Sequence, residues 1–189
     1  MVQLVQSPSS LSLSDFLQLP ETEPPSEYID GCIYQKPMPK GKHSKLQTSL
    51  TAAINQAGEP QQLAYALTEL RCTFGGRSLV PDISVFQWQR IPVNANGEIE
   101  DTFEIAPDWV IEILSPEQSQ TRVIEKIIFC LNHGTQLGWL IDPQERLAIV
   151  FTQAQLPEVK RDQDILQATG LLGDWQLPVA DLFGWLTLK

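Results

Sequence analysis

The chain has 189 residues, 42% of them hydrophobic, with 23 acidic and 13 basic side chains and a formal net charge of −10. This length suits a single domain with a sizeable core, and this hydrophobic content excludes a disordered chain. The acidity disfavours unspecific attraction to nucleic acid unless basic residues cluster locally. The three cysteines are too far apart for a Cys/His metal motif, which predicts reduced thiols and a cytoplasmic protein.

The first part of the chain predicts a loose leader over residues 1–13, a short helix and a hairpin. Ser14 is the expected N-cap of the helix, because its hydroxyl can accept a hydrogen bond from the first turn. Asp30 and Gly31 are a favoured type I′ pair and predict the hairpin turn. An amphipathic helix is expected over 41–56, where apolar residues recur at helical spacing.

Two long strands, 66–74 and 78–88, are expected next, joined by the glycine pair 75–76 into an antiparallel hairpin. The polar stretch 90–106 predicts a loop. A central strand follows over 107–116, PDWVIEILSP, because an almost unbroken apolar run between two prolines is typical of a strand buried on both faces.

A helix over 119–132 and a strand over 136–143 predict a right-handed crossover between two parallel strands. The segment 145–151 is expected to pair antiparallel with the second of them, followed by a surface connection. The tail over 153–189 is apolar and rich in aromatic residues, so we expect it to wrap over the core, which spans 14–152, or over an interface. Together these elements predict a mixed sheet with helices on both faces.

The central strand carries one acid, Glu112, among apolar side chains. A buried ionised carboxylate costs several kcal/mol unless a cation, hydrogen bonds or a bound proton compensates it. Asp82 follows Pro81 at the start of the neighbouring strand, and the two carboxylates converge if their faces coincide. Because oxygen ligands select a hard cation, the pair predicts Mg²⁺ or Mn²⁺.

Lys126, on the following helix, is the candidate catalytic lysine of a phosphodiesterase site. Its ammonium would orient a water molecule or stabilise developing charge, while the metal polarises the phosphate. Each candidate has an ordinary alternative. In this alternative, Glu112 would be a buried acid satisfied by an arginine or by backbone amides, and Asp82 would cap the start of a strand. Lys126 would be a solvated lysine, because it lies off the centre of the apolar helix face.

Three accessory candidates lie elsewhere in the chain. His43 stands at the start of a helix, where anions bind, and its alternative is a satisfied or exposed histidine. Glu27 and Glu69 are accessory acids of the site or paired surface carboxylates. Four lysines form either a basic rim able to meet a nucleic-acid backbone or a solvated face: Lys36, Lys40, Lys42 and Lys45.

Several motifs together resemble the Uma2 (DUF820) family, within the PD-(D/E)XK nuclease superfamily. They are PD at 81–82, PDWVIEILSP at 107–116, EK at 125–126 and GWLIDP at 138–143, with EYIDG at 27–31 and HSKLQ from His43 upstream. The resemblance covers about residues 14–152. It implies a restriction-endonuclease-like α/β fold, which is a mixed β-sheet flanked by helices on both faces.

The resemblance also implies roles for individual residues. Two acidic metal ligands, one carbonyl ligand and a catalytic lysine are implied, and these are Asp82 and Glu112, the backbone carbonyl of Ile113, and Lys126. The wider superfamily has its lysine two positions after the second acid, where this chain has Leu114, and Uma2 members resemble this chain in that departure. Many relatives have an acid four positions before the helix lysine, where this chain has Arg122.

The first hypothesis is therefore an Mg²⁺-dependent endonuclease that hydrolyses DNA phosphodiester bonds with a metal-activated water. The alternative is a non-catalytic binding or assembly module that retains the nuclease fold, which the acidity and the missing in-line lysine favour. A third hypothesis is a metal-dependent hydrolase of another phosphoester. DNA is the expected partner, no membrane span is expected because no apolar run approaches ~18 residues, and the apolar tail favours a homodimer.

Overall fold

The computed structural model describes residues 11–116, 118–168 and 170–188, so most of the predicted leader, residues 1–10, lies outside the described part. The helices described are α1 (Leu13–Phe16), α2 (Gly41–Gly58), α3 (Gln120–Asn132) and α4 (Val179–Gly184), with short 3-10 turns at Glu59–Gln61 and Trp88–Arg90. Within these segments, no helix combines the length and apolar character needed to cross a membrane.

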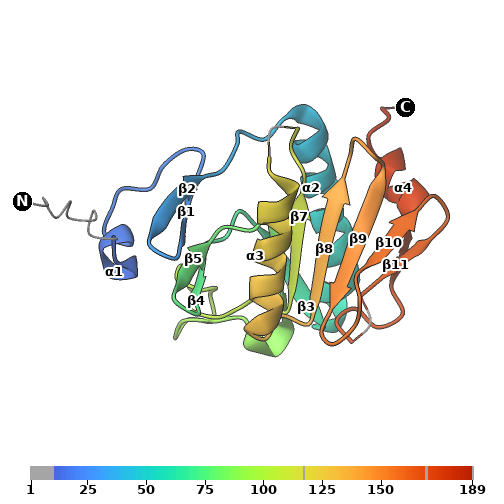
Figure 1. Ribbon diagram of the computed structural model, residues 1–189. Helices are drawn as coiled ribbons and strands as arrows, with labels where there is room; N and C mark the ends of the chain where they lie inside the picture. The colour runs from blue at the N-terminus through green and yellow to red at the C-terminus, as the bar shows by residue number, and fades with distance from the viewer. Residues whose placement is uncertain (1–10, 117, 169, 189) are drawn as a thin grey trace, which may run out of the picture.

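The main sheet has six strands in the order β10-β9-β8-β7-β6-β3 (Figure 1). Their bounds are β3 (Ala64–Thr68), β6 (Ile83–Gln87), β7 (Trp109–Ile113), β8 (Leu137–Asp142), β9 (Leu147–Thr152) and β10 (Glu158–Arg161). β7 and β8 are parallel and joined by α3, whereas the other neighbouring pairs are antiparallel. α3 packs on one face and α2 on the other. The predicted mixed sheet between helices is thus confirmed.

A second sheet, in the order β2-β1-β5-β4, lies beside the main one (Figure 1). Its strands are β1 (Ser26–Ile29), β2 (Cys32–Gln35), β4 (Cys72–Phe74) and β5 (Arg77–Leu79), and β11 (Ile165–Gln167) pairs separately with β12 (Gln176–Pro178). The turn between β1 and β2 has positive φ angles, 50° at Asp30 and 86° at Gly31. Such angles are required by a type I′ turn, so the predicted hairpin is confirmed.

The second predicted hairpin is present, but each of its arms is broken and shared between the two sheets. β3 and β6 pair in the main sheet, whereas β4 and β5 pair in the small sheet around the glycine pair 75–76. One arm breaks at Glu69, whose φ is 50°, and the other at Pro81, which has no N–H for a ladder hydrogen bond. The prediction of two continuous strands was wrong, and Asp82 lies at the junction between the sheets.

Two apolar cores lie on opposite faces of β7, because successive side chains of a strand alternate between its faces. Trp109, Ile111 and Ile113 pack on the α2 side, together with apolar residues of the C-terminal tail. Val110 packs on the α3 side. The same alternation puts Glu112 on the α3 side.

Two local predictions are wrong. α1 begins at Leu13 and is capped by Ser12 rather than Ser14, because Ser12 forms a capping box with Asp15. The stretch after β9, predicted to be a surface connection, contains β10, which pairs antiparallel with β9 at the edge of the main sheet. Charged side chains are typical of an edge strand, and here they conceal the strand pattern.

Candidate active site

Two acids meet between the neighbouring strands β6 and β7. The antiparallel register pairs Ile83 with Ile111, so Asp82, one residue earlier, comes opposite Glu112. Asp82 is 2% exposed and Glu112 is 1% exposed. Burial is the main reason that the pKa of Glu112 is raised, and the neighbouring charge of Asp82 raises it further.

Asp82 is held by three donors. Its Oδ2 accepts a hydrogen bond of 2.7 Å from the backbone N–H of Ile113 and lies 3.0 Å from Nε2 of His43. Its Oδ1 accepts a hydrogen bond of 2.8 Å from the ammonium of Lys36. Burial alone would raise the pKa of Asp82, but Lys36 and His43 outweigh it and hold that pKa well below its usual range. Asp82 is therefore ionised at neutral pH.

Glu112 is compensated less completely. The Nζ of Lys126 lies 2.7 Å from its Oε1, while Oε2 has no hydrogen-bond partner among the described residues. Burial raises the pKa of Glu112 to about 8, an effect that Lys126 opposes and Asp82 reinforces. Without a bound cation, Glu112 therefore holds a proton at neutral pH, and a cation at this carboxylate would replace that proton.

Lys126 is buried, with 5% of its side chain exposed, so the alternative of a solvated lysine was wrong. Its Nζ donates hydrogen bonds to Oε1 of Glu27 at 2.6 Å and to the carbonyl of Val80 at 3.3 Å. Burial alone would lower the pKa of Lys126, but the carboxylates of Glu112 and Glu27 raise it above its usual value. The ammonium is therefore charged and acts as a donor.

The close approach of α3 to the sheet explains why Lys126 points inward. The buried face of α3 includes Val123, Ile127 and Cys130, and it packs against β8 at Gly138. A Cβ at Gly138 would lie 2.4 Å from Cγ2 of Ile127. Because the glycine lets the helix come this close, the neighbouring lysine reaches Glu112 on the adjacent strand.

Lys36, which follows β2, also belongs to this cluster of buried charges. The sequence indicates it only as one of four lysines of a basic rim or a solvated face. Its Nζ lies 2.7 Å from Oε2 of Glu69, 2.8 Å from Oδ1 of Asp82 and 2.9 Å from the carbonyl of Val80. Burial would lower its pKa, yet Asp82 contributes to raising that pKa above the usual value. The side chains of β2 are largely exposed, so no local pattern indicates a buried ammonium.

The structure brings all three accessory candidates to the cluster. Glu27 is 7% exposed and accepts the backbone N–H of Val80 at 2.8 Å. His43 is 6% exposed, which excludes the exposed alternative. Glu69 lies at the rim, with 35% of its side chain exposed and its Oε1 accepting from Gln47 at 2.8 Å.

The cluster carries more negative than positive charge. Its formal charge is −2 when Glu112 is ionised and His43 is neutral, from four carboxylates and two ammoniums: Glu27, Glu69, Asp82, Glu112, Lys36 and Lys126. One divalent cation would balance that charge. The unpartnered Oε2 of Glu112, near the ionised Asp82, therefore fits a hard cation by charge and by donor type.

Side chains alone do not complete such a site. Among the residues described, no group of three or more His, Cys, Asp or Glu side chains is arranged to hold a metal ion. Mg²⁺ usually takes only one or two protein carboxylates and completes its shell with water and substrate oxygens. The N–H and C=O of a strand residue point to the same neighbour, so the carbonyl of Ile113 faces the edge where its N–H meets Asp82.

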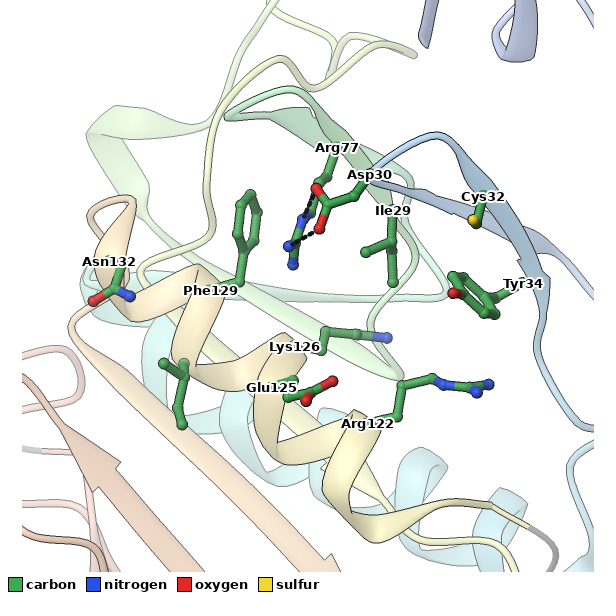
Figure 2. A pocket seen from close by; sticks show the side chains of 11 residues that line it. Ile29, Asp30, Cys32, Tyr34, Arg77, Arg122, Glu125, Lys126, Phe129 and Asn132 are labelled. Carbon is green, nitrogen blue, oxygen red and sulfur yellow. Dashed lines mark hydrogen bonds and ion pairs between the residues drawn. The ribbon is translucent and has the colours of Figure 1, made fainter. Parts of the chain in front are cut away.

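Cavities reach the cluster from two directions. One of about 510 Å³ lies between the β1–β2 hairpin and α3 and has Lys126 in its wall (Figure 2). Another of about 210 Å³ is lined by Lys36, His43, Glu69 and Asp82, among other residues. The buried charges can thus be approached by ligands from either side.

The architecture defines the class of the protein as restriction-endonuclease-like. The chain belongs to the Uma2 family, described as "Putative restriction endonuclease", whose model matches residues 13–180. It is 54% identical to a "putative nuclease belonging to DUF820" from Anabaena variabilis. That crystal structure superimposes with a TM-score of 0.91, over 93% of this chain and 99% of the other. No curated protein matches the chain. The predicted family and fold class are confirmed.

Proposed function

We propose that the protein is an Mg²⁺- or Mn²⁺-dependent endonuclease that hydrolyses DNA phosphodiester bonds at the cluster of Asp82, Glu112 and Lys126. The observation that carries the proposal is a buried carboxylate, Glu112, that has an unpartnered oxygen and lies opposite a second, ionised carboxylate. The net charge of the cluster supports a divalent ion, and membership of a nuclease family supports a nucleic-acid substrate.

Asp82 and Glu112 would hold the ion together with the carbonyl of Ile113. When bound, the ion supplies Lewis acidity toward the phosphate and lowers the pKa of a water molecule. Lys126 orients that water or stabilises the charge that develops on the phosphate. Because its pKa is raised, Lys126 does not serve as the base. Glu27 positions Lys126 through their hydrogen bond of 2.6 Å.

The test of activity is cleavage of plasmid DNA and labelled oligonucleotides in Mg²⁺ and in Mn²⁺. Asp82→Asn, Glu112→Gln and Lys126→Met should each lower the cleavage rate by about 100-fold or more. The first two remove a carboxylate that would hold the ion, and the third removes the ammonium that would orient the water or stabilise the developing charge. Glu145→Gln is the control, since Glu145 is exposed in the turn between β8 and β9. Equal rates in all variants would show that any cleavage comes from a contaminant.

Metal binding is measured independently of cleavage, by thermal unfolding and calorimetry with Mn²⁺. We expect Mn²⁺ to stabilise the wild type and to have little effect on Glu112→Gln, because an ion that binds only the folded state raises its stability. Affinity for Mn²⁺ should increase as the pH rises through about 8, since the proton on Glu112 must leave first. A wild type that Mn²⁺ neither stabilises nor activates would contradict the proposal.

One observation favours a second candidate, a non-catalytic binding or assembly module. Both oxygens of Asp82 already have donors, from Lys36 on one side and from His43 and the Ile113 amide on the other. Lys36→Met separates the two candidates. If Lys36 competes with a metal ion for Asp82, this variant binds Mn²⁺ more tightly than the wild type. If the site is purely structural, the variant is destabilised and binds no Mn²⁺.

A further inference from the structure

The cavity of about 510 Å³ between the β1–β2 hairpin and α3 has features that the catalytic cluster does not use (Figure 2). The hairpin contributes Tyr34 to its wall, and α3 contributes Arg122 and Lys126. Because Lys126 also contacts Glu112, a ligand in this cavity lies next to the cluster. The volume is within the range of cavities that bind small molecules and is sufficient for a nucleotide.

Arg122 is an exposed cation of this cavity with no ion pair among the described residues. Its Cζ lies over the ring of Tyr34, 4.5 Å from the ring centroid. Such a contact fixes the planar guanidinium and leaves its edge donors free for a phosphate. Arg77 differs, because it is paired with Asp30 and lies over Phe129.

Tyr34 adds an uncharged donor. Its hydroxyl makes no hydrogen bond to another of the described residues, and in Figure 2 it points into the cavity, toward Lys126. The hydroxyl and the guanidinium of Arg122 therefore lie on the same side of the cavity. Together they offer several N–H and O–H donors, which is the donor set that phosphate oxygens require.

The side chains that line the cavity include one more cation than acid, although the chain as a whole has a net charge of −10. Three cations and two acids line the cavity: Arg77, Arg122, Lys126, Asp30 and Glu125. Arg77 is balanced by Asp30, and Lys126 by Glu27 and Glu112. Arg122 is the cation left for a ligand, and Glu125, one turn further along α3, is the acid that would repel one.

We propose that Arg122 and Tyr34 form a subsite for a backbone phosphate of the DNA strand that is cut, next to the phosphate that is hydrolysed. The subsite deepens the proposed function and rests on it, since Lys126 connects the cavity to the cluster. Arg122 binds the phosphate through its guanidinium edge, and the Tyr34 hydroxyl donates a further hydrogen bond. The subsite would set the position of the strand relative to Lys126.

The first test measures binding of labelled single- and double-stranded oligonucleotides by fluorescence anisotropy, in EDTA and in Ca²⁺. Arg122→Gln should weaken binding about tenfold and should reduce the salt dependence by about one charge. Tyr34→Phe, which keeps the ring under Arg122, should weaken binding by roughly threefold. Glu125→Gln should have the opposite sign and tighten binding, because it removes the repelling acid.

The matched control is Arg146→Gln. Arg146 is also an exposed arginine over an aromatic ring, that of Phe183, but it lies in the turn between β8 and β9, away from the cavity. Its affinity and salt dependence should equal those of the wild type. Equal losses in Arg146→Gln and Arg122→Gln would reveal only a general effect of charge and would overturn the subsite.

The second test identifies the phosphate itself. Oligonucleotides with one uncharged methylphosphonate linkage, moved along the strand, should lose affinity for the wild type at one linkage. Arg122→Gln should show no further loss there, because its partner is already absent. Suppose that no single linkage causes a loss of affinity, and that inorganic phosphate displaces the oligonucleotide from the wild type but not from Arg122→Gln. The cavity then takes a free anion, which overturns the proposal of a backbone subsite.

Cys32 provides a readout that does not depend on cleavage. This exposed thiol lines the same cavity, so a bound oligonucleotide should slow its alkylation by iodoacetamide in the wild type and much less in Arg122→Gln. If Arg122→Gln has the affinity, the linkage profile and the thiol protection of the wild type, the subsite is overturned, even if the protein cuts DNA. A linkage effect that persists in a protein without metal binding or cleavage refutes the hydrolytic function and keeps the subsite.

Discussion

Glu112 links the stability of the protein to pH, because its carboxyl is buried near the ionised Asp82. Burial raises its pKa from 4.5 to about 8, whereas the unfolded chain has the ordinary value. Between these two pH values the folded state retains a proton that the unfolded state has released. The contribution of Glu112 to stability is therefore complete below about pH 4.5 and is lost as the pH rises through about 8.

Glu112→Gln should flatten this dependence when metal ions are removed with EDTA. At pH 8.5 the variant should be more stable than the wild type by about 1 kcal/mol or more, which corresponds to ~2–4 °C in a chain of this size. Near pH 5 the two should differ little. Thermal unfolding followed by circular dichroism at pH 5, 7 and 8.5 measures the difference. Parallel curves for wild type and variant would argue against a buried neutral acid.

Lys126 is the counter-ion of two buried acids, so its removal should cost more than that of an exposed lysine. Lys126→Met leaves Glu27 and Glu112 without the ammonium that lies 2.6 and 2.7 Å from them. We expect a loss of about 3–5 kcal/mol in the free energy of unfolding. Urea unfolding at pH 7 measures it, with Lys160→Met on the edge strand β10 as the control. A loss below about 1 kcal/mol would contradict the buried arrangement.

The sequence identifies Asp82 and Glu112 as candidates because an acid in an apolar strand must be compensated and its neighbour follows a strand-breaking proline. It does not reveal which cations compensate them. Lys36 reaches Asp82 across 46 residues, and Lys126 reaches Glu27 across 99. Contacts of such long range leave no local pattern, and helical periodicity alone places Lys126 off the apolar centre of α3 when it is in fact buried.

At the scale of elements, the contact between α3 and β8 sets the position of Lys126. Gly138→Ala would place a Cβ 2.4 Å from Ile127 and push the helix away from the sheet. We expect a loss of about 1–3 kcal/mol in stability, as for other overpacked cores, together with slower cleavage. Gly184→Ala in α4 is the control, because a Cβ there meets no atom within 4 Å. Equal urea midpoints for the two variants would contradict the close contact.

The elements themselves were largely predictable where one pattern of apolar residues runs through the whole segment. The apolar run of β7, the spacing along α2 and α3, and the Asp30-Gly31 turn each correspond to an observed element. The division of the long hairpin was not predicted, because the strand pattern continues through the breaks. Pro81 was the available indication, since a proline within a strand run marks an edge or an interruption.

At the scale of the whole molecule, the layered packing separates the three cysteines into two groups. Cys32 is exposed on β2, whereas Cys72 of β4 and Cys130 of α3 are buried. One thiol per chain should react rapidly with Ellman's reagent in the native protein, and the other two only after unfolding. A Cys32→Ser variant should then show no rapid reaction. Two or more rapid thiols in the native wild type would contradict this packing.

The passage of two arms from the small sheet to the main sheet limits how the protein can move. The small sheet and its flank supply Glu27 and Lys36, while Asp82 and Glu112 belong to the main sheet and its edge. A hinge motion at Glu69 and Pro81 would separate these partners. The two sheets therefore cannot move apart without breaking the ion pairs between them. If the protein cuts DNA as proposed, the DNA must supply the deformation, and easily kinked or unstacked steps should be cut in preference to stiff ones.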